Sequence, residues 1–178
     1  MTVMIRRAVA ADAGALAAVA AVTFPLACPP HTTEESKAQF VATVLSEERF
    51  ADYVDDDHRA VLIAEDADGA AVGYTMVNFG EPTDDDVSAA IRIRPTAELS
   101  KCYVLPGHHG AGVASSLLSE SLEVAAAYGA QSIWLGVNEE NERAQRFYAK
   151  NGFERVGSKR FLVGESLEDD WVMERALP

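Results

Sequence analysis

Hydrophobic residues along the chain follow two spacings, and each spacing predicts one type of element. Short apolar or alternating stretches predict strands at 3–9, 61–65, 70–79, 97–105, 132–137, 153–163 and 171–174. Helical spacing predicts helices at 12–23, 33–45, 46–53, from the glycine-rich turn after residue 106 to 128, and at 141–150. Asp68-Gly69 predicts a tight hairpin turn between the second and third strands.

The order of these elements predicts an α/β fold. A central β-α-β-α unit is flanked by antiparallel pieces, which indicates a mixed, mostly antiparallel sheet flanked by helices. The segment FPLACPPHTT (24–33) contains three prolines and is predicted to end the first helix. No internal repeat or low-complexity linker interrupts the chain, so we expect one domain over residues 1–178.

Charge narrows the range of partners. The chain has 15 Lys and Arg against 28 Asp and Glu, a net charge of −13, and no basic stripe that would follow a phosphate backbone. We therefore expect no nucleic-acid partner. No uninterrupted run of about 18 apolar residues is present, and no apolar run follows the two arginines near the start. These features predict no membrane association and a cytoplasmic location.

Cysteine and histidine spacing indicates neither a disulfide nor a metal site. Cys28 and Cys102 lie 74 positions apart in unrelated contexts, and the four histidines lack the spacing of zinc ligands. We expect no metal.

The stretch VLPGHHGAGVASSLL (104–118) joins a strand to a helix through a glycine-rich turn. The first turn of a helix has N–H groups without partners, and the helix dipole adds about half a positive charge there, so phosphate is the usual ligand. The mononucleotide loop pattern fails because Val113 stands where lysine is required. The dinucleotide pattern fails because Ser115 stands at its third glycine. A third pattern, [QR]-x-x-G-x-[GA], matches residues 109–114 except at His109.

This turn, with ELSKCYVLP before it and NERAQRFYAKNGF after it, resembles the acetyl-CoA site of the Gcn5-related N-acetyltransferase (GNAT) superfamily. The resemblance extends over essentially the whole chain. SIWLGVNEENERAQRFYAKNGF and the tail FLVGESLEDDWVMERAL resemble the spermidine/spermine acetyltransferase branch. The resemblance implies a GNAT-like sheet whose β-α-β-α unit binds acetyl-CoA as cosubstrate.

The resemblance also implies roles for individual residues in binding CoA. Main-chain N–H groups would hold the pyrophosphate at His109, Gly110, Ala111, Gly112, Val113 and Ala114. Main-chain groups of Cys102, Tyr103 and Val104 would hold the pantetheine arm, and the Val104 N–H would stabilise the thioester oxygen, worth roughly 3–4 kcal/mol. Because the family usually has Gln or Arg at the His109 position, we expect weaker CoA binding or a neutral-backbone site.

On the following helix, Asn141, Ala144 and Tyr148 share one face because they are three and four residues apart. By the same resemblance, Asn141 holds the CoA arm and Tyr148 is the general acid that protonates the leaving thiolate. Glu98 matches an acidic position of many relatives. A substrate ammonium with a pKa near 10 must lose a proton before it attacks a thioester. Three roles for Glu98 stay open: direct base, base through a water, or ligand of the substrate cation.

The residues that would bind the acetyl acceptor are predicted in less detail than those that would bind CoA. Phe24 either lines the acceptor site or packs beneath the first helix. A polyamine would need spaced carboxylates, which the loops offer at Glu34, Glu35, Glu81 and 84–86. Four late apolar residues would form either a homodimer surface or core: Phe161, Val163, Trp171 and Val172.

Together these features predict an acetyl-CoA-dependent N-acetyltransferase that acts on a primary amine of a small molecule, with spermidine or spermine as the favoured class. We expect direct transfer in a ternary complex, because neither cysteine is placed where a covalent acetyl carrier is expected. The alternatives are an acetyltransferase for a protein N-terminus or an aminoglycoside, and a non-catalytic acetyl-CoA-binding sensor or interaction module.

Overall fold

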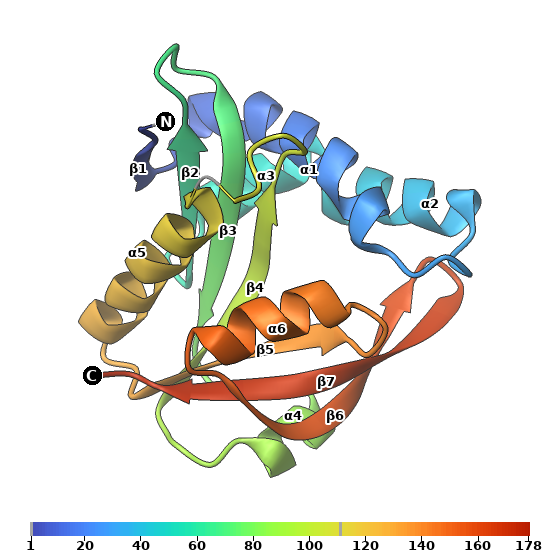
Figure 1. The fold of residues 1–178 in the computed structure, drawn as a ribbon, viewed down its shortest axis with the longest axis vertical. Helices are drawn as coiled ribbons and strands as arrows, with labels where there is room; N and C mark the ends of the chain where they lie inside the picture. Colours follow the sequence, from blue (N-terminus) through green and yellow to red (C-terminus); the bar gives the residue numbers. More distant parts are fainter. Residues whose placement is uncertain (1, 111) are drawn as a thin grey trace.

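The computed structural model describes residues 2–110 and 112–178, and its strands form one seven-stranded sheet (Figure 1). The order across the sheet is β1-β2-β3-β4-β5-β7-β6, and among the paired neighbours only β4 and β5 run parallel. The mixed, mostly antiparallel α/β fold predicted from the sequence is therefore confirmed. The strands are β1 Met4–Arg7, β2 Arg59–Glu65, β3 Ala71–Phe79, β4 Thr96–Val104, β5 Ser132–Asn138, β6 Glu154–Val163 and β7 Ser166–Ala176.

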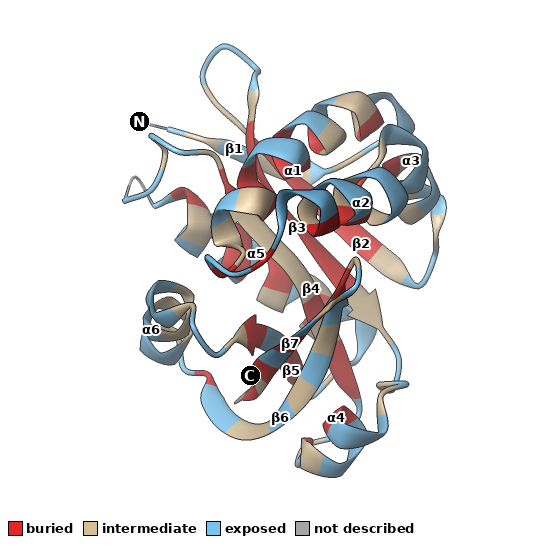
Figure 2. Cartoon of the chain, turned by 90° about the vertical axis from the view of Figure 1, so that its right-hand side faces the viewer, coloured by how far each residue is buried: buried red, intermediate tan, exposed pale blue. Residues whose placement is uncertain are grey.

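Helices cover both faces of the sheet. Along β2, Val61 and Ile63 pack in the cluster of the first three helices, whereas Leu62 and Ala64 pack in the cluster of α5. This alternation follows from the two-residue period of a strand, and Figure 2 shows the resulting buried interior. The helical elements are η1 Ala10–Asp12, α1 Ala13–Ala27, α2 Glu34–Val44, α3 Glu47–Asp55, α4 Asp85–Ala90, α5 Val113–Tyr128 and α6 Glu142–Lys150.

Three sequence predictions differ from the structure. Helix α1 continues through Pro25 to Ala27, since a proline in the last turn removes only one helical hydrogen bond there. Residues 85–90 form α4 rather than a loop, because the Asp84 side chain accepts hydrogen bonds from the N–H groups of Asp86 and Val87. Strand β7 begins at Ser166 rather than at residue 171, because it pairs with β6 from the tip of their hairpin.

The expectation of no membrane-crossing segment needs one qualification. Residues Ala10–Ala27 form a helical stretch that is long and apolar enough to cross a bilayer by length and composition, with a mean hydropathy of 1.6. A third of this stretch is buried, and Leu16 and Ala20 are completely buried in the cluster that includes β2 and β3. The core helix of a soluble protein has the same properties.

Strands β4 and β5 separate after a short pairing. Only Thr96, Ala97 and Glu98 pair with β5, and the two strands diverge beyond this point (Figure 1). Within β4 the register with β3 shifts, because Met76 lies opposite Lys101 while Val77 lies opposite Leu99. This β-bulge and the separation open the sheet at its centre.

The core beneath α3 offers a test of stability. Phe50 is completely buried, and its ring meets those of Tyr53 and Tyr74 edge-on, at centroid distances of 5.7 and 5.3 Å. We expect Phe50→Ala to lower the free energy of unfolding by about 3–5 kcal/mol, because it removes apolar contacts and leaves a cavity. Urea denaturation measures this change. As a control, Leu167→Ala at a half-exposed position should change it by less than about 0.5 kcal/mol, and equal losses for the two variants would contradict this assignment.

Candidate active site

A cavity of about 860 Å³ lies where β4 and β5 diverge. Its "α6 side" is lined by α6, by the glycine-rich turn and by Cys102 of β4. Its "α1 side" is lined by Glu98 and Lys101 of β4 and by side chains from α1, α2, β6 and β7. A concave site of this size, with apolar walls and a few polar groups, is typical of small-molecule binding.

The glycine-rich turn owes its glycines to backbone conformation. Gly107, Gly110 and Gly112 have φ angles of 89°, 82° and 79°, a region in which side chains are disfavoured. A Cβ at any of the three would meet nothing within 4 Å, so crowding by the protein itself does not explain them. Gly112 caps α5 without a side-chain hydrogen bond, which leaves the first N–H groups of α5 open at the cavity. Ala111, one of the expected pyrophosphate ligands, lies outside the described residues.

His109 does not point its ring nitrogen toward this open backbone. Its Nε2 lies 2.8 Å from the carbonyl oxygen of Val104, and since a carbonyl only accepts, Nε2 is the donor. The imidazole is thus held on the end of β4. An anion bound at the turn would therefore contact backbone N–H groups rather than the imidazole. This arrangement fits the second expectation for His109, a site formed by the neutral backbone.

The main chain of β4 presents two of the three expected residues to the cavity. The main-chain N–H of Leu105 donates to the carbonyl of Val72, so these two residues form a hydrogen-bonded pair at the end of the ladder between β3 and β4. Along an antiparallel ladder, pairs that are joined by main-chain hydrogen bonds alternate with pairs that are not. It follows that Tyr103 exchanges its main-chain hydrogen bonds with Tyr74, whereas Cys102 and Val104 direct theirs away from β3. The Tyr103 side chain still lines the cavity, but its main chain is not placed for the pantetheine role predicted from the sequence.

Helix α6 brings Asn141, Ala144 and Tyr148 to the cavity together. Asn141 caps the helix, because its side-chain oxygen accepts from the N–H of Ala144 at 3.2 Å. Its amide nitrogen donates to no acceptor within residues 2–110 and 112–178 and remains available as a donor. Phe147 both packs on the core and lines the cavity.

Tyr148 and Cys102 face each other across the α6 side. Burial is the main cause that raises the pKa of Tyr148 well above its usual value, so its hydroxyl stays protonated at neutral pH. Burial also raises the pKa of Cys102 to about 11, although a hydrogen bond with Tyr148 opposes the rise. Cys102 therefore lies beside the residue predicted to be the general acid, although neither cysteine was expected at the position of a covalent acetyl carrier. A thiol with this pKa is a poor nucleophile at neutral pH, so direct transfer still fits this geometry better than a cysteine carrier.

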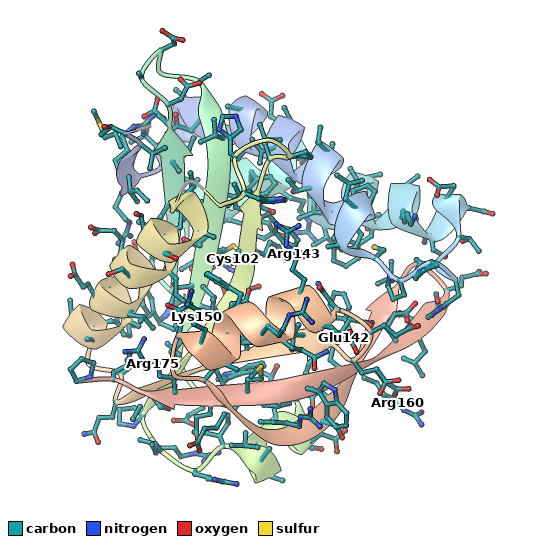
Figure 3. The ribbon with its side chains drawn as sticks, viewed as in Figure 1. Cys102, Glu142, Arg143, Lys150, Arg160 and Arg175 are labelled. Carbon is teal, nitrogen blue, oxygen red and sulfur yellow. The ribbon has the colours of Figure 1, made fainter. Side chains whose placement is uncertain are left out.

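Two basic residues of α6 also border the cavity and were missed from the sequence. Both Arg143 and Lys150 line the cavity, and Figure 3 shows Arg143 above α6 and Lys150 near the left-hand end of this helix. Arg143 and Lys150 are seven residues, about two helical turns, apart and so share one face of α6, which was the only sequence signal for them. They supply positive charge on the α6 side. His109 does not direct its Nε2 toward the turn, because this atom donates to the carbonyl of Val104.

Glu98 lies on the α1 side of β4. Its strand partner Asn78 donates from Nδ2 to Glu98 Oε1 at 3.0 Å, and this contact orients the carboxylate. Residues paired across two strands share a face of the sheet, so Lys101 faces the same way as its partner Met76, toward α1. Glu98 and Tyr148 thus approach the cavity from opposite sides.

Phe24 occupies both of its predicted positions. It is buried in the last turn of α1, stacks on Phe40 with ring centroids 4.4 Å apart, and lines the cavity. The acidic loop residues, by contrast, do not line it. Glu34 pairs with Lys37, Glu81 pairs with Arg94, and Asp84 caps α4.

The residues predicted for a dimer surface lie in the chain's own core. Val163 and Val172 are 2% and 0% exposed, Phe161 meets Phe40 edge-on, and Trp171 is covered by Arg155. The core alternative is thus the one that the structure supports for these residues.

Three charged residues on the α1 side were not identified from the sequence: Lys101, Lys159 and Asp170. Asp170 is 7% exposed, and burial raises the pKa of its carboxyl to about 6, although Lys159 opposes the rise. Burial lowers the pKa of Lys101 to about 8. Strongly shifted groups that line one cavity are typical of functional sites.

The raised pKa of Asp170 predicts a gain in stability on neutralisation. Its pKa rises from 3.8 to about 6 on folding, so its favourable contribution is complete below pH 3.8 and is lost as the pH rises through 6. We expect Asp170→Asn to raise the free energy of unfolding by about 1–3 kcal/mol at pH 8 and by much less at pH 4. Urea denaturation at both pH values tests this. A loss of stability at pH 8 would mean that the carboxylate is stabilised by a partner.

Among the described residues, one group of side chains could hold a metal ion: His31, Glu140 and Glu168. Their ligand atoms lie within 4.8 Å of one another. The prediction from histidine spacing did not find it, because these residues come from three distant segments. His31 Nδ1 lies 3.2 Å from Glu140, while its Nε2 lies 2.8 Å from Glu168. Each ring nitrogen thus faces a different carboxylate, which is the geometry of an imidazole bridging two acids.

Known proteins are similar to this chain in sequence and in fold. A sequence model of the "Acetyltransferase (GNAT) family" matches residues 24–153, which include β4, α5, β5 and α6. Uncharacterized N-acetyltransferases of Mycobacterium bovis and Mycobacterium tuberculosis are 49% identical to the chain over 166 residues, 93% of this chain and 98% of theirs. A mycothiol acetyltransferase of Frankia casuarinae is 37% identical over 97 residues, 54% of this chain and 28% of its own.

Among solved structures, the PaiA N-acetyltransferase of Thermoplasma acidophilum in complex with coenzyme A has a similar fold. The TM-score is 0.78, with 99% of each chain covered and 21% sequence identity. At this identity the likeness shows the fold alone.

Proposed function

Because this chain belongs to the acetyltransferase (GNAT) family and is an acetyl-CoA-dependent N-acetyltransferase of that kind, we propose that it transfers the acetyl group directly to a primary amine of a small molecule. One observation supports direct transfer of the acetyl group from acetyl-CoA to the amine. A proton acceptor, Glu98, and a proton donor, Tyr148, reach one cavity from opposite sides of β4. This arrangement suits a ternary complex in which the amine and the thioester meet at the gap between β4 and β5.

Acetyl-CoA fits the α6 side. The open N–H groups at the start of α5 would hold its pyrophosphate, and Arg143 and Lys150 would add positive charge near the phosphates. The free main-chain groups of Cys102 and Val104 would bind the pantetheine arm as an added strand does, with the amide of Asn141 on its other side. The Val104 N–H would donate to the thioester oxygen as it gains charge.

The proposed reaction combines acetyl transfer with proton transfers at Glu98 and Tyr148. Glu98, directly or through one water, takes a proton from the acceptor ammonium, and the free amine attacks the thioester carbonyl carbon. The new C–N bond forms as the C–S bond breaks, and Tyr148 donates its proton to the leaving thiolate. The products are the N-acetylated acceptor and CoA with a free thiol. On becoming an amide the nitrogen loses its second proton, which returns to Tyr148 through solvent, and Glu98 releases its proton to solvent, so one proton is released for each acetyl group transferred.

The first experiment combines the purified protein with acetyl-CoA and a panel of amines. The panel contains spermidine, spermine, an aminoglycoside, a peptide with a free N-terminus and several amino acids. Release of free thiol, with the acetylated product identified by mass spectrometry, supports the proposal. Tight binding of acetyl-CoA without turnover of any amine would overturn it and would favour the sensor alternative. The polyamine class itself stays a prediction, because the acidic residues that suggested it lie outside the cavity.

A further inference from the structure

The α1 side of the cavity contains two lysines without acidic partners. The chain has 28 acidic residues against 15 basic ones, so there are many carboxylates with which a lysine could form an ion pair. Nevertheless, in the described part of the chain, neither Lys101 nor Lys159 has a carboxylate oxygen within 4.0 Å. An ammonium removed from water without a partner is costly, so an unpaired lysine in a cavity indicates a site for an anion.

Both ammonium groups flank the same pair of aromatic rings. Lys101 Nζ lies 5.9 Å from the ring centre of Phe40, and Lys159 Nζ lies 5.1 Å from that of Phe161. The two rings meet edge-on with centroids 5.5 Å apart. The lysines therefore converge on one apolar wall of the cavity although they come from different strands.

Gly136 of β5 makes room for two of the charged groups. A Cβ at this position would lie 3.1 Å from Asp170 Oδ2 and 3.7 Å from Lys159 Nζ. Both groups therefore lie above the bare backbone of Gly136, on the floor of the cavity. Although Lys159 and Asp170 are direct partners across β6 and β7, they do not form an ion pair within 4.0 Å.

Asp170 is the acidic counterpart of the two lysines. Its neighbour on the same strand face, Glu168, is satisfied, because it accepts hydrogen bonds from Thr32 and Ser166 and contacts His31. Asp170 is just as buried, at 7% exposed, yet no hydrogen bond reaches its side chain from the described residues. The α1 side thus presents two lysines without an ion pair and one carboxylate without a hydrogen bond, Asp170, around an apolar wall, while Glu98 is held by the amide of Asn78.

We propose that the acceptor is a primary amine that also carries a carboxylate, as a free amino acid does: Lys101 and Lys159 bind the carboxylate, and Asp170 binds the ammonium. This inference rests on the proposed function. Phe24, Phe40 and Phe161 would contact the hydrocarbon part of the acceptor. A polyamine is disfavoured, because its repeated positive charges would lie against the two lysines.

Acceptors with and without the carboxylate test this inference. Phenylalanine is compared with phenylalaninamide, and leucine with leucinamide, for the wild type and for Lys101→Met and Lys159→Met. We expect the wild type to prefer the acids. Each variant should lower kcat/KM for the acids about 10- to 100-fold and leave the KM for acetyl-CoA unchanged, because a charged hydrogen bond to the acceptor alone is lost.

The control is Arg160→Met, which removes a neighbouring positive charge. Arg160 lies next to Lys159 on β6, is exposed and points away from the cavity (Figure 3). It should leave the preference for acids unchanged.

The outcomes separate this inference from the function on which it rests. If spermidine or the amides are acetylated as well as the acids, or if each lysine variant affects acids and amides equally, the inference is overturned while the proposed function stands. If acetyl-CoA binds and no amine is acetylated, both are overturned. A loss confined to the carboxylate acceptors supports both.

Discussion

Replacing Tyr148 with phenylalanine is expected to lower kcat about 10²- to 10⁴-fold while acetyl-CoA binding is retained. The hydroxyl is the proposed proton donor and lies beside Cys102 at the cavity, and its raised pKa keeps it protonated over the neutral range. Removing one oxygen leaves the ring, which packs edge-on against Phe147 and Phe153. The loss therefore reports on protonation of the leaving thiolate rather than on packing.

The measurement follows thiol release under saturating acetyl-CoA, with the affinity for acetyl-CoA determined separately by calorimetry. Tyr128→Phe is the matched control, since Tyr128 is 55% exposed and stacks on Phe79 at the end of α5, outside the cavity. It should retain wild-type kcat. A Tyr148→Phe variant that turns over at the wild-type rate would remove Tyr148 from the proposed acid role.

Replacing Glu98 with glutamine is expected to lower kcat/KM about 10²-fold or more for an acceptor whose ammonium has a pKa near 10. The amide cannot take the proton, although it can still accept the hydrogen bond from Asn78. For an acceptor amine with a pKa near 7, much of the amine is already neutral. The loss should then shrink, because the base is no longer required.

This comparison separates the three roles left open for Glu98. A loss that depends on the pKa of the acceptor supports a base, direct or through water. A loss confined to the KM of cationic acceptors, with kcat retained, would show that Glu98 only binds the cation. The control is Glu120→Gln at an exposed position of α5, which should match the wild type.

The elements that depend on local patterning could be predicted from the sequence. The hairpin turn at Asp68-Gly69, the stop of α5 at Gly129 and the cap of α6 by Asn141 depend on residues a few positions apart. The order of strand, glycine turn and helix is equally local, so most of the described residues predicted to bind CoA do line the α6 side, whereas Arg143 and Lys150 were not predicted. The main exception is Tyr103, whose main chain is taken up by its partner strand.

The α1 side depends on contacts that no local pattern contains. Lys101, Lys159 and Asp170 come from three strands, and they meet only because β7 lies between β5 and β6 in the sheet. In the sequence, Asp170 is one of three successive acidic residues and is indistinguishable from a solvated acidic turn.

The bulge in β4 is a second feature of the α1 side that no local pattern predicted. Glu98 and Lys101 are three positions apart, and a regular strand would place them on opposite faces. The register shift between Met76 and Val77 turns both toward α1. The elements and the glycine-rich turn could be predicted because they depend on short-range backbone preferences. The charges around the proposed acceptor site could not, because strand order and one extra residue in β4 set which side chains share a face.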